Sequence, residues 1–210
     1  MMQKRMEAEK VHVIACGALA REILAVRDMA GLDHMSVACL PAIWHNHPQK
    51  IAPAVDAAIE EARAEGATRI FVAYADCGTG GALDKVLEKH GVDRIAGPHC
   101  YSFFSGNEAF QKSSDDDVTT FFLTDFLARQ FEAFVVGPLG LDRHPELREM
   151  YFGNYEKLVY LAQTEDEALT AKAREAAAYL GLAFERRFTA YGDLATSLAD
   201  AAQSVTPRRI

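Results

Sequence analysis

Short apolar runs alternate with longer amphipathic segments along most of the chain. The apolar runs are rich in Val, Ile, Leu and Phe and end at Gly or Pro, which is typical of buried strands. The segments between them place apolar residues at helical spacing, and one of them closes at Gly66. Strands are predicted in residues 11–16, 34–40, 71–75, 92–97, 157–163 and 182–191. Helices are predicted in residues 19–30, 50–66, 82–91, 119–137, 144–155, 166–181 and 192–203.

This alternation predicts the fold class. Strands joined by helices pair in parallel through right-handed crossovers. We therefore expect an α/β protein with a doubly wound, mostly parallel open sheet of about six strands and helices on both faces. Residues 1–210 are expected to form a single domain, with a disordered N-terminus at residues 1–9. Residues 101–117 look irregular, and their acidic end from Ser113 to Asp117 is expected to be a surface loop.

Three cysteines, Cys16, Cys77 and Cys100, follow three of the predicted strands. The carboxyl ends of parallel strands lie on one edge of the sheet, where ligands of such folds bind, so we expect the three thiols to gather there. Thiolates suit zinc, and three protein ligands with an open fourth position form a catalytic zinc site. An iron–sulfur cluster is the less favoured cofactor, and redox exchange and plain core packing remain alternatives. Cys39, inside a strand, is interpreted as a core residue.

Histidines near the same predicted edge extend this candidate metal site. The turn after the second strand carries His45 and His47 in "WHNHPQ", and His99 comes directly before Cys100. Two histidines separated by one residue on a loop need not face the same way, so the ligand among them stays open. His45 or His99 is predicted to act as a fourth ligand or an acid–base group. Asp76 is a candidate catalytic residue that would orient a histidine.

The turn after the third strand, "DCGTGGALDK", suggests a second activity for this edge. Gly78, Thr79, Gly80 and Gly81 precede a predicted helix, and backbone N–H groups at a helix N-terminus bind anions. These residues are predicted to bind an anionic substrate group such as a carboxylate, although a purely structural tight turn is equally consistent with them. The same helix N-terminus is expected to lower the pKa of Cys77.

The composition and charge of the chain disfavour two classes of function, nucleic-acid binding and membrane insertion. The net charge of -8 disfavours a nucleic-acid-binding protein, because phosphate binding needs clustered Lys and Arg. No apolar run approaches the ~20 residues of a membrane span, and the charged N-terminal stretch does not resemble a signal peptide. We therefore expect a cytoplasmic protein without nucleic-acid or membrane partners. In that compartment its four cysteines would be reduced.

Several strings occurring in order resemble the uncharacterised family known as domain of unknown function 1638, or DUF1638. The resemblance extends from Val11 to about Leu194 and rests on "ACGALAREI", "LPAIWHNHP", "YADCGTGGALD", "GPHCYSFFSG", "TTFFLTDFLARQF" and "GLDRHPELREMYFGNYEKLVYLAQT". It implies a context of corrinoid-dependent methyltransferases, including cobalamin-dependent methionine synthases of the split type. The chain lacks the D-x-H-x-x-G corrinoid-binding signature, so it is not expected to carry cobalamin itself.

Chemistry and resemblance together favour a zinc-binding protein of corrinoid-linked one-carbon metabolism. Its expected task is methyl transfer to a thiol, or upkeep of a cobalamin-dependent methyltransferase, with methionine synthesis as one such pathway. Its expected partner is a small-molecule substrate or a corrinoid methyltransferase component, and the interpretation leans towards an enzyme. One alternative is a non-enzymatic partner protein with a structural metal site and an aromatic docking helix. Another is a hydrolase with Cys77 as nucleophile and His45 or His99 as base.

Overall fold

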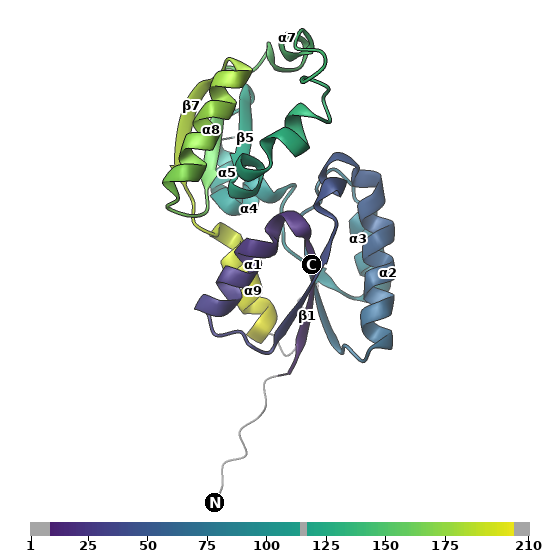
Figure 1. The fold of residues 1–210 in the computed structure, drawn as a ribbon. Coiled ribbons are helices and arrows are strands. Elements are labelled where there is room, and N and C mark those ends of the chain that lie inside the picture. Colours follow the sequence, from purple (N-terminus) through teal and green to yellow (C-terminus); the bar gives the residue numbers. More distant parts are fainter. Residues whose placement is uncertain (1–8, 114–116, 204–210) are drawn as a thin grey trace, which may run out of the picture. The chain divides into compact units, whose positions relative to one another are not determined.

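The computed structural model describes residues 9–113 and 117–203, whose contacts form two compact units. Unit 1 combines the described residues up to Ile95 with those from Leu194, and unit 2 comprises Ala96–Asp193. Each unit holds its own parallel sheet with helices against it (Figure 1). The predicted disorder of residues 1–9 concerns a segment that, apart from Glu9, lies outside the described residues.

Unit 1 is built on a four-stranded parallel sheet with the strand order β2-β1-β3-β4. Its strands are β1 (Val11–Cys16), β2 (Met35–Leu40), β3 (Arg69–Ala73) and β4 (Asp93–Arg94). Its helices are α1 (Ala20–Met29), α2 (Ile51–Ala64), α3 (Ala82–His90) and most of α9 (Gly192–Gln203). Three short 3₁₀ helices join them: η1 (Gly17–Leu19), η2 (Ala42–Asn46) and η3 (Pro48–Lys50).

Helices cover both faces of this sheet, α1 and α9 on one side and α2 and α3 on the other (Figure 1). On the second side the fully buried Ile14, Val72 and Leu83 belong to one apolar cluster. On the first side Arg69 of β3 donates a 2.5 Å hydrogen bond to the carbonyl of Ala201 in α9. Burial on both faces explains why the strands read as nearly continuous apolar runs.

Unit 2 is built on a three-stranded parallel sheet with the order β5-β6-β7. Its strands are β5 (Thr120–Thr124), β6 (Lys157–Ala162) and β7 (Ala183–Phe188). Its helices are α4 (Cys100–Ser105), α5 (Asn107–Ser113), α6 (Asp125–Arg129), the π-helix η4 (Glu132–Val136), α7 (Leu147–Phe152) and α8 (Glu167–Leu180). One face packs on α6, η4 and α8, while Phe122 and Val159 on the other face meet Tyr101 and Phe110 of α4 and α5.

The structure confirms the α/β class with parallel strands flanked by helices, but it distributes the strands over two sheets. The prediction of one sheet of about six strands overlooked the change of unit after Ile95, and the single domain stays a prediction. No Gly/Ser-rich or charged linker marks that position, where the sequence continues as Ala96-Gly97-Pro98. Composition therefore carries no signal for the division.

The helix predicted over residues 119–137 is wrong in its first part, which forms β5. Phe122 faces one side of the sheet and Leu123 the other, and both are buried. A strand buried on both faces has no alternation of apolar and polar residues, so periodicity cannot separate it from a buried helix. The helical prediction holds only from Asp125 onward, as α6 and then η4.

The segment expected to be irregular contains α4 and α5. Residues 114–116 of the predicted acidic loop lie outside the described residues. Asp117 is buried, with its carboxylate 3.0 Å from Arg187 and 3.3 Å from Lys157, so at this residue the surface-loop prediction is wrong. Two cations compensate the cost of burying this charge. Among the described helices, none has the length and apolar character that crossing a membrane requires.

Candidate functional site

The carboxyl edge of the unit 1 sheet carries the strongest candidate site. In the order β2-β1-β3-β4, the chain passes from β1 to β2 on one side and then crosses from β2 to β3 on the other side of β1. Open α/β sheets bind ligands at such a switch point, outside the carboxyl ends of the strands. Cys16 is the last residue of β1, and Cys77 lies in the turn between β3 and α3. Two of the three predicted metal ligands therefore flank the switch point.

Cys16, Tyr74 and Cys77 share one face of this edge. The register pairs Ala15 with Ala73, so the next residues, Cys16 and Tyr74, lie side by side at the ends of the neighbouring strands β1 and β3. Tyr74 belongs to the buried cluster formed with α2 and α3, and both cysteines pack partly buried against that cluster. Tyr74 was not foreseen from the sequence, although its position two residues after the buried Val72 places it on the same strand face.

The Tyr74 hydroxyl is buried, and no hydrogen bond of good geometry within the described structure replaces its lost hydration. The residue is 1% exposed, and its hydroxyl lies beside the Cys16 thiol without a hydrogen bond of acceptable geometry to any described residue. Burial, followed by the neighbouring Cys16 thiol, raises the Tyr74 pKa, so the phenol stays protonated. An unpaired buried hydroxyl costs free energy and is rare in native proteins. Of the groups at this edge, the Cys16 thiol lies next to the hydroxyl, in a contact short of good hydrogen-bond geometry.

Burial dominates the acidity of both thiols. It raises the pKa of Cys16, and it raises the pKa of Cys77 to about 12, with a further increase from the nearby Cys16. The expectation that the helix N-terminus would lower the Cys77 pKa is wrong, because desolvation outweighs any such effect. Both thiols are protonated near pH 7, and thiolates would form there when a metal ion displaces their protons.

The backbone of Cys77 adopts a conformation that residues with a side chain seldom take. Its φ is 51°, and Gly78 follows with φ 80°. A non-glycine residue in the left-handed region costs about 1–3 kcal/mol and persists only where its surroundings impose it, most often at functional sites. The neighbouring Gly78 lies against η3, since a Cβ there would be in ordinary contact with the Pro48 ring at 3.4 Å. The strand–turn–helix connection thus places the Cys77 backbone at the edge of the sheet.

Asp76 closes the glycine turn. One carboxylate oxygen accepts hydrogen bonds from the Thr79 hydroxyl at 2.6 Å and the Gly81 N–H at 3.0 Å, and the other accepts from the Gly80 N–H at 3.2 Å. The Thr79 N–H donates to the Asp76 carbonyl. The N–H groups of Thr79, Gly80 and Gly81 are thus already bound by the protein's own Asp76, which weakens the case for an anion cradle at Gly78 to Gly81, and anion binding there stays a prediction. Asp76 supports the turn that holds Cys77, and no hydrogen bond joins it to a histidine in the described structure.

Asp76→Ala is expected to lower the free energy of unfolding by about 1–2 kcal/mol at pH 7, because three hydrogen bonds to a carboxylate are lost. Burial raises the Asp76 pKa, but the bonds from Thr79, Gly81 and Gly80 outweigh it and hold the pKa below its usual 3.8. The stability that Asp76 contributes is therefore complete well above pH 3.8 and is lost as the pH falls through the lower folded-state pKa. Urea denaturation of both proteins at several pH values measures this difference.

Asp28→Ala is the matched control for that comparison. Asp28 is also an aspartate of unit 1, is 65% exposed and pairs only with its neighbour Arg27 in the described structure. Its removal should change stability by no more than about 0.5 kcal/mol. A deficit of the Asp76 variant that stayed constant down to pH 2 would contradict the assigned role of its carboxylate.

The predicted histidines are divided between the two units. His45 lies in η2 and His47 at its end, on the segment that leads from β2 across the end of β1. That segment packs closely, since a Cβ at Gly17 would lie 2.9 Å from the Leu40 carbonyl oxygen. The His45 side chain is exposed, yet desolvation by the surrounding protein lowers its pKa. Its imidazole is therefore neutral near pH 7, the form that binds metals.

Cys100 and His99 belong to unit 2, at the start of α4. His99 packs against Tyr101 and Phe110, with ring centroids 5.2 and 5.1 Å away, and burial lowers its pKa. Its Nδ1 is buried without a hydrogen-bond partner among the described residues. The predicted joint role of Cys100 with Cys16 and Cys77 stays a prediction.

Cys39 is not the core residue that the sequence suggested. It lies in the edge strand β2 and is exposed. The register pairs Cys39 with Ala15 and Leu40 with Cys16, so Cys39 points to the face opposite that of Cys16. Cys39 therefore serves as a control thiol close to the candidate site but outside it.

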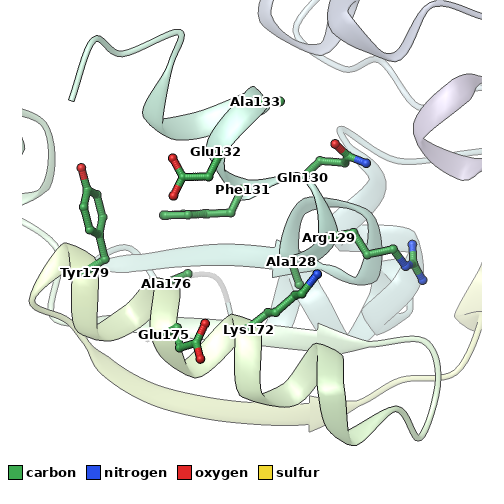
Figure 2. Close-up of a pocket in the computed structure, with 10 residues that line it drawn as sticks. All are labelled: Ala128, Arg129, Gln130, Phe131, Glu132, Ala133, Lys172, Glu175, Ala176 and Tyr179. Carbon is green, nitrogen blue, oxygen red and sulfur yellow. The ribbon is translucent and has the colours of Figure 1, made fainter. Parts of the chain in front are cut away.

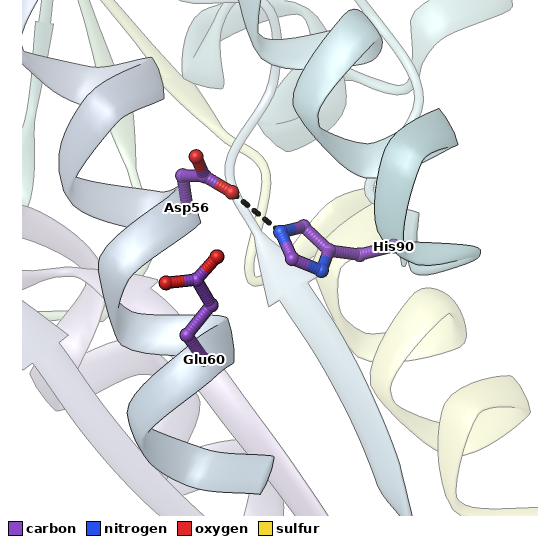
Figure 3. A group of neighbouring side chains, drawn as sticks. All are labelled: Asp56, Glu60 and His90. Carbon is purple, nitrogen blue, oxygen red and sulfur yellow. Dashed lines mark hydrogen bonds and ion pairs between the residues drawn. The ribbon is translucent and has the colours of Figure 1, made fainter. Parts of the chain in front are cut away.

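A second cluster of potential ligands was not foreseen from the sequence, although Asp56 and Glu60 stand one helical turn apart. The carboxylates of α2 and the His90 imidazole at the end of α3 point towards one another, with ligand atoms within 4.8 Å (Figure 3). His90 Nε2 lies 2.5 Å from Asp56 Oδ1. Lys89 Nζ already lies 2.9 Å from Asp56 and 3.4 Å from Glu60. We assign this cluster to ion pairing between α2 and α3.

The donor chemistry of the switch-point site fits zinc. Cys16 and Cys77 offer two soft ligands and His45 a neutral imidazole. In the described structure these three do not form a set with donor atoms within 4.8 Å of one another. A bound ion would therefore require rotation of these side chains. The unpaired Tyr74 hydroxyl is consistent with such a rearrangement.

Comparison with known proteins places the chain in a family. Residues 39–198 match the family described as protein of unknown function (DUF1638). That range includes Tyr74, Cys77 and Cys100 and begins after Cys16, whereas the expected resemblance began at Val11. No curated protein and no solved structure matches the chain. The chain belongs to the DUF1638 family.

Proposed function

We propose that unit 1 binds zinc at the carboxyl ends of β1 and β3, and that this site serves corrinoid-linked one-carbon metabolism. The observation that carries the proposal is the buried Tyr74 hydroxyl without a partner, beside Cys16 and close to Cys77. Two protonated, half-buried thiols and an unsatisfied hydroxyl at a switch point form a site prepared for a ligand. Soft donors select zinc among common divalent ions of the cell.

Cys16 and Cys77 would supply thiolates to the ion, and His45 would supply an imidazole. The Asp76 turn would hold the backbone of Cys77 in place, so that only its side chain would rotate to reach the ion. Bound zinc supplies a Lewis acid that keeps a substrate thiol as the nucleophilic thiolate at neutral pH. The reaction would then be methyl transfer to that thiol, or upkeep of a cobalamin-dependent methyltransferase. The corrinoid context rests on the DUF1638 resemblance.

A hydrolase with Cys77 as nucleophile is a second candidate, favoured by the left-handed backbone of Cys77 at a strand–turn–helix connection. Its thiol, with a pKa near 12, would need a strong base, and no hydrogen bond joins it to a histidine among the described residues. The non-enzymatic alternative relied on an aromatic helix that docks a partner, and most of that segment is buried. Phe122, Leu123 and Leu127 of that segment are at most 8% exposed and belong to the unit 2 core.

A deletion strain tests the proposed function in cells. Corrinoid-dependent methyl transfer should fail without the protein and return with the wild type and with Cys39→Ser, but not with Cys16→Ser. All variants should accumulate to similar levels, because Cys16 lies at the end of its strand and serine is of similar size. Equal rescue by Cys16→Ser would contradict the site, and unimpaired methyl transfer in the deletion strain would contradict the corrinoid link.

A further inference from the structure

Unit 2 contains a cavity of about 450 Å³ between its helices. Its walls come from the end of α6, the start of η4 and the middle of α8 (Figure 2). Ala128, Phe131 and Ala176 form a buried apolar floor, and Tyr179 stands at one end. Arg129 and Lys172 line the end away from Tyr179 (Figure 2). The volume suits a small organic molecule, since ligand pockets begin at about 300 Å³.

Arg129 is held in position by a buried carboxylate. Its Nη2 lies 3.6 Å from Oδ2 of Asp125, whose side chain is 0% exposed. Asp125 is fixed in turn by hydrogen bonds from the Tyr160 hydroxyl at 2.7 Å, the Thr164 hydroxyl at 2.5 Å and the Gln163 N–H at 3.0 Å. An arginine placed by such a network loses little side-chain freedom when it binds a ligand.

Lys172 adds a second positive charge from α8. Its side chain reaches towards the Arg129 end of the cavity (Figure 2), and it forms no ion pair with any residue the structure describes. A guanidinium and an ammonium facing one space recognise a carboxylate through charge-assisted hydrogen bonds. The carboxylates of Glu132 and Glu175 also line the cavity and repel any negative charge, so a ligand with one charge held at the Arg129 and Lys172 end is repelled less than a dianion.

The backbone beside this cavity is irregular in a manner typical of binding sites. α6 ends at Arg129, and the chain continues from Glu132 as the π-helix η4. π-Helical turns are rare and occur frequently at functional sites. Phe131, the residue before η4, and Glu132, the first residue of η4, both line the cavity (Figure 2).

We propose that this cavity binds a small monocarboxylate with an apolar or aromatic body. Arg129 and Lys172 bind the carboxylate, and Phe131 packs against the apolar body. Glu132 and Glu175 select against dianions. This site lies within unit 2 and does not depend on zinc binding by unit 1.

Benzoate is the probe, with benzamide as its neutral isostere and phthalate as a dianion. In titrations followed by amide resonances of the isotopically labelled full-length protein, benzoate should shift residues 128–133 and 172–179 in a saturable manner. Benzamide and phthalate should each bind at least about tenfold more weakly than benzoate. Benzamide has no negative charge to pair with the two cations, and phthalate carries a second negative charge that the glutamates repel. High salt should weaken benzoate binding, since Lys172 is exposed.

Single substitutions test the contributions of Lys172 and Arg129 one at a time and should leave the fold intact. Lys172→Ala changes an exposed side chain and should weaken benzoate binding about five- to tenfold. Arg129→Lys keeps a cation beside Asp125 but loses the planar fork, and should weaken binding by a similar factor. Lys112→Ala, which removes another exposed lysine of unit 2, should leave benzoate binding unchanged. Equal binding of benzoate and benzamide, wild-type affinity in both cavity variants, or no saturable shift with benzoate would each overturn the proposal.

Discussion

Cys77→Ser should reduce zinc affinity by at least about 100-fold while the protein stays folded. Loss of a supporting group around zinc ligands already costs about 10–100-fold in affinity, and a serine hydroxyl stays protonated where the thiol would ionise on binding. The substitution is nearly isosteric, and Cys77 lies in a turn at the rim of the core. Its cost in stability should therefore stay near ~1–2 kcal/mol, from burying a hydroxyl.

Competition with a chromogenic chelator measures this affinity, and urea denaturation of the metal-free proteins measures the stability. Cys39→Ser is the control, because Cys39 is an exposed thiol on the opposite face of the same sheet. It should bind zinc like the wild type and lose almost no stability. If the two serine variants bound zinc equally well, Cys77 would not be a ligand.

Asp125→Ala is expected to lower the free energy of unfolding by about 3–5 kcal/mol, since removal of one partner of a buried charged network leaves the others unpaired. Tyr160, Gln163 and Thr164 would each lose a hydrogen bond to the same carboxylate at the carboxyl edge of the unit 2 sheet. Burial, followed by Asp125, raises the Tyr160 pKa, so its phenol remains a protonated donor without an acceptor in the variant.

The matched control is Asp142→Ala in the same unit. Asp142 is 54% exposed and lies 3.6 Å from its neighbour Arg143, so its loss should cost no more than about 0.5 kcal/mol. Urea unfolding gives the free energies, and hydrogen exchange of β5 and β6 should locate the loss in unit 2. Similar stabilities for both variants would show that the Asp125 network does not support the sheet.

The sequence contained most of the secondary structure but not its division into two sheets. Strands such as β1 and β6 end at Gly or polar residues and could be recognised one by one. The pairing of strands is a long-range property, and the boundary at Ala96 carries no linker composition. β5 escaped detection because Phe122 and Leu123 bury opposite faces, so the strand lacks the alternation that separates strands from helices.

Part of the candidate site followed from topology. Parallel strands end at one edge, which was enough to bring Cys16 and Cys77 together. Their acidity could not be read from the sequence, because desolvation depends on packing that local motifs do not encode. From the sequence, Asp76 was expected to orient a histidine, whereas in the structure its carboxylate accepts hydrogen bonds from the N–H groups of its own turn. Only the folded backbone shows which N–H groups are already bound. Arg129 and Lys172 face one cavity because α6 and α8 are neighbours in space.

Zinc binding by Cys16 and Cys77 is tested by the zinc content of the wild-type protein, prepared without a histidine tag. Elemental analysis of the wild type and of Cys16→Ser and Cys77→Ser should be carried out on the same batches. We expect about one zinc ion per wild-type chain and little in either variant, because both thiolates are required for a site with three protein ligands. Wild-type protein without zinc after growth and dialysis in zinc-containing medium would contradict this expectation, as would equal zinc in all three proteins.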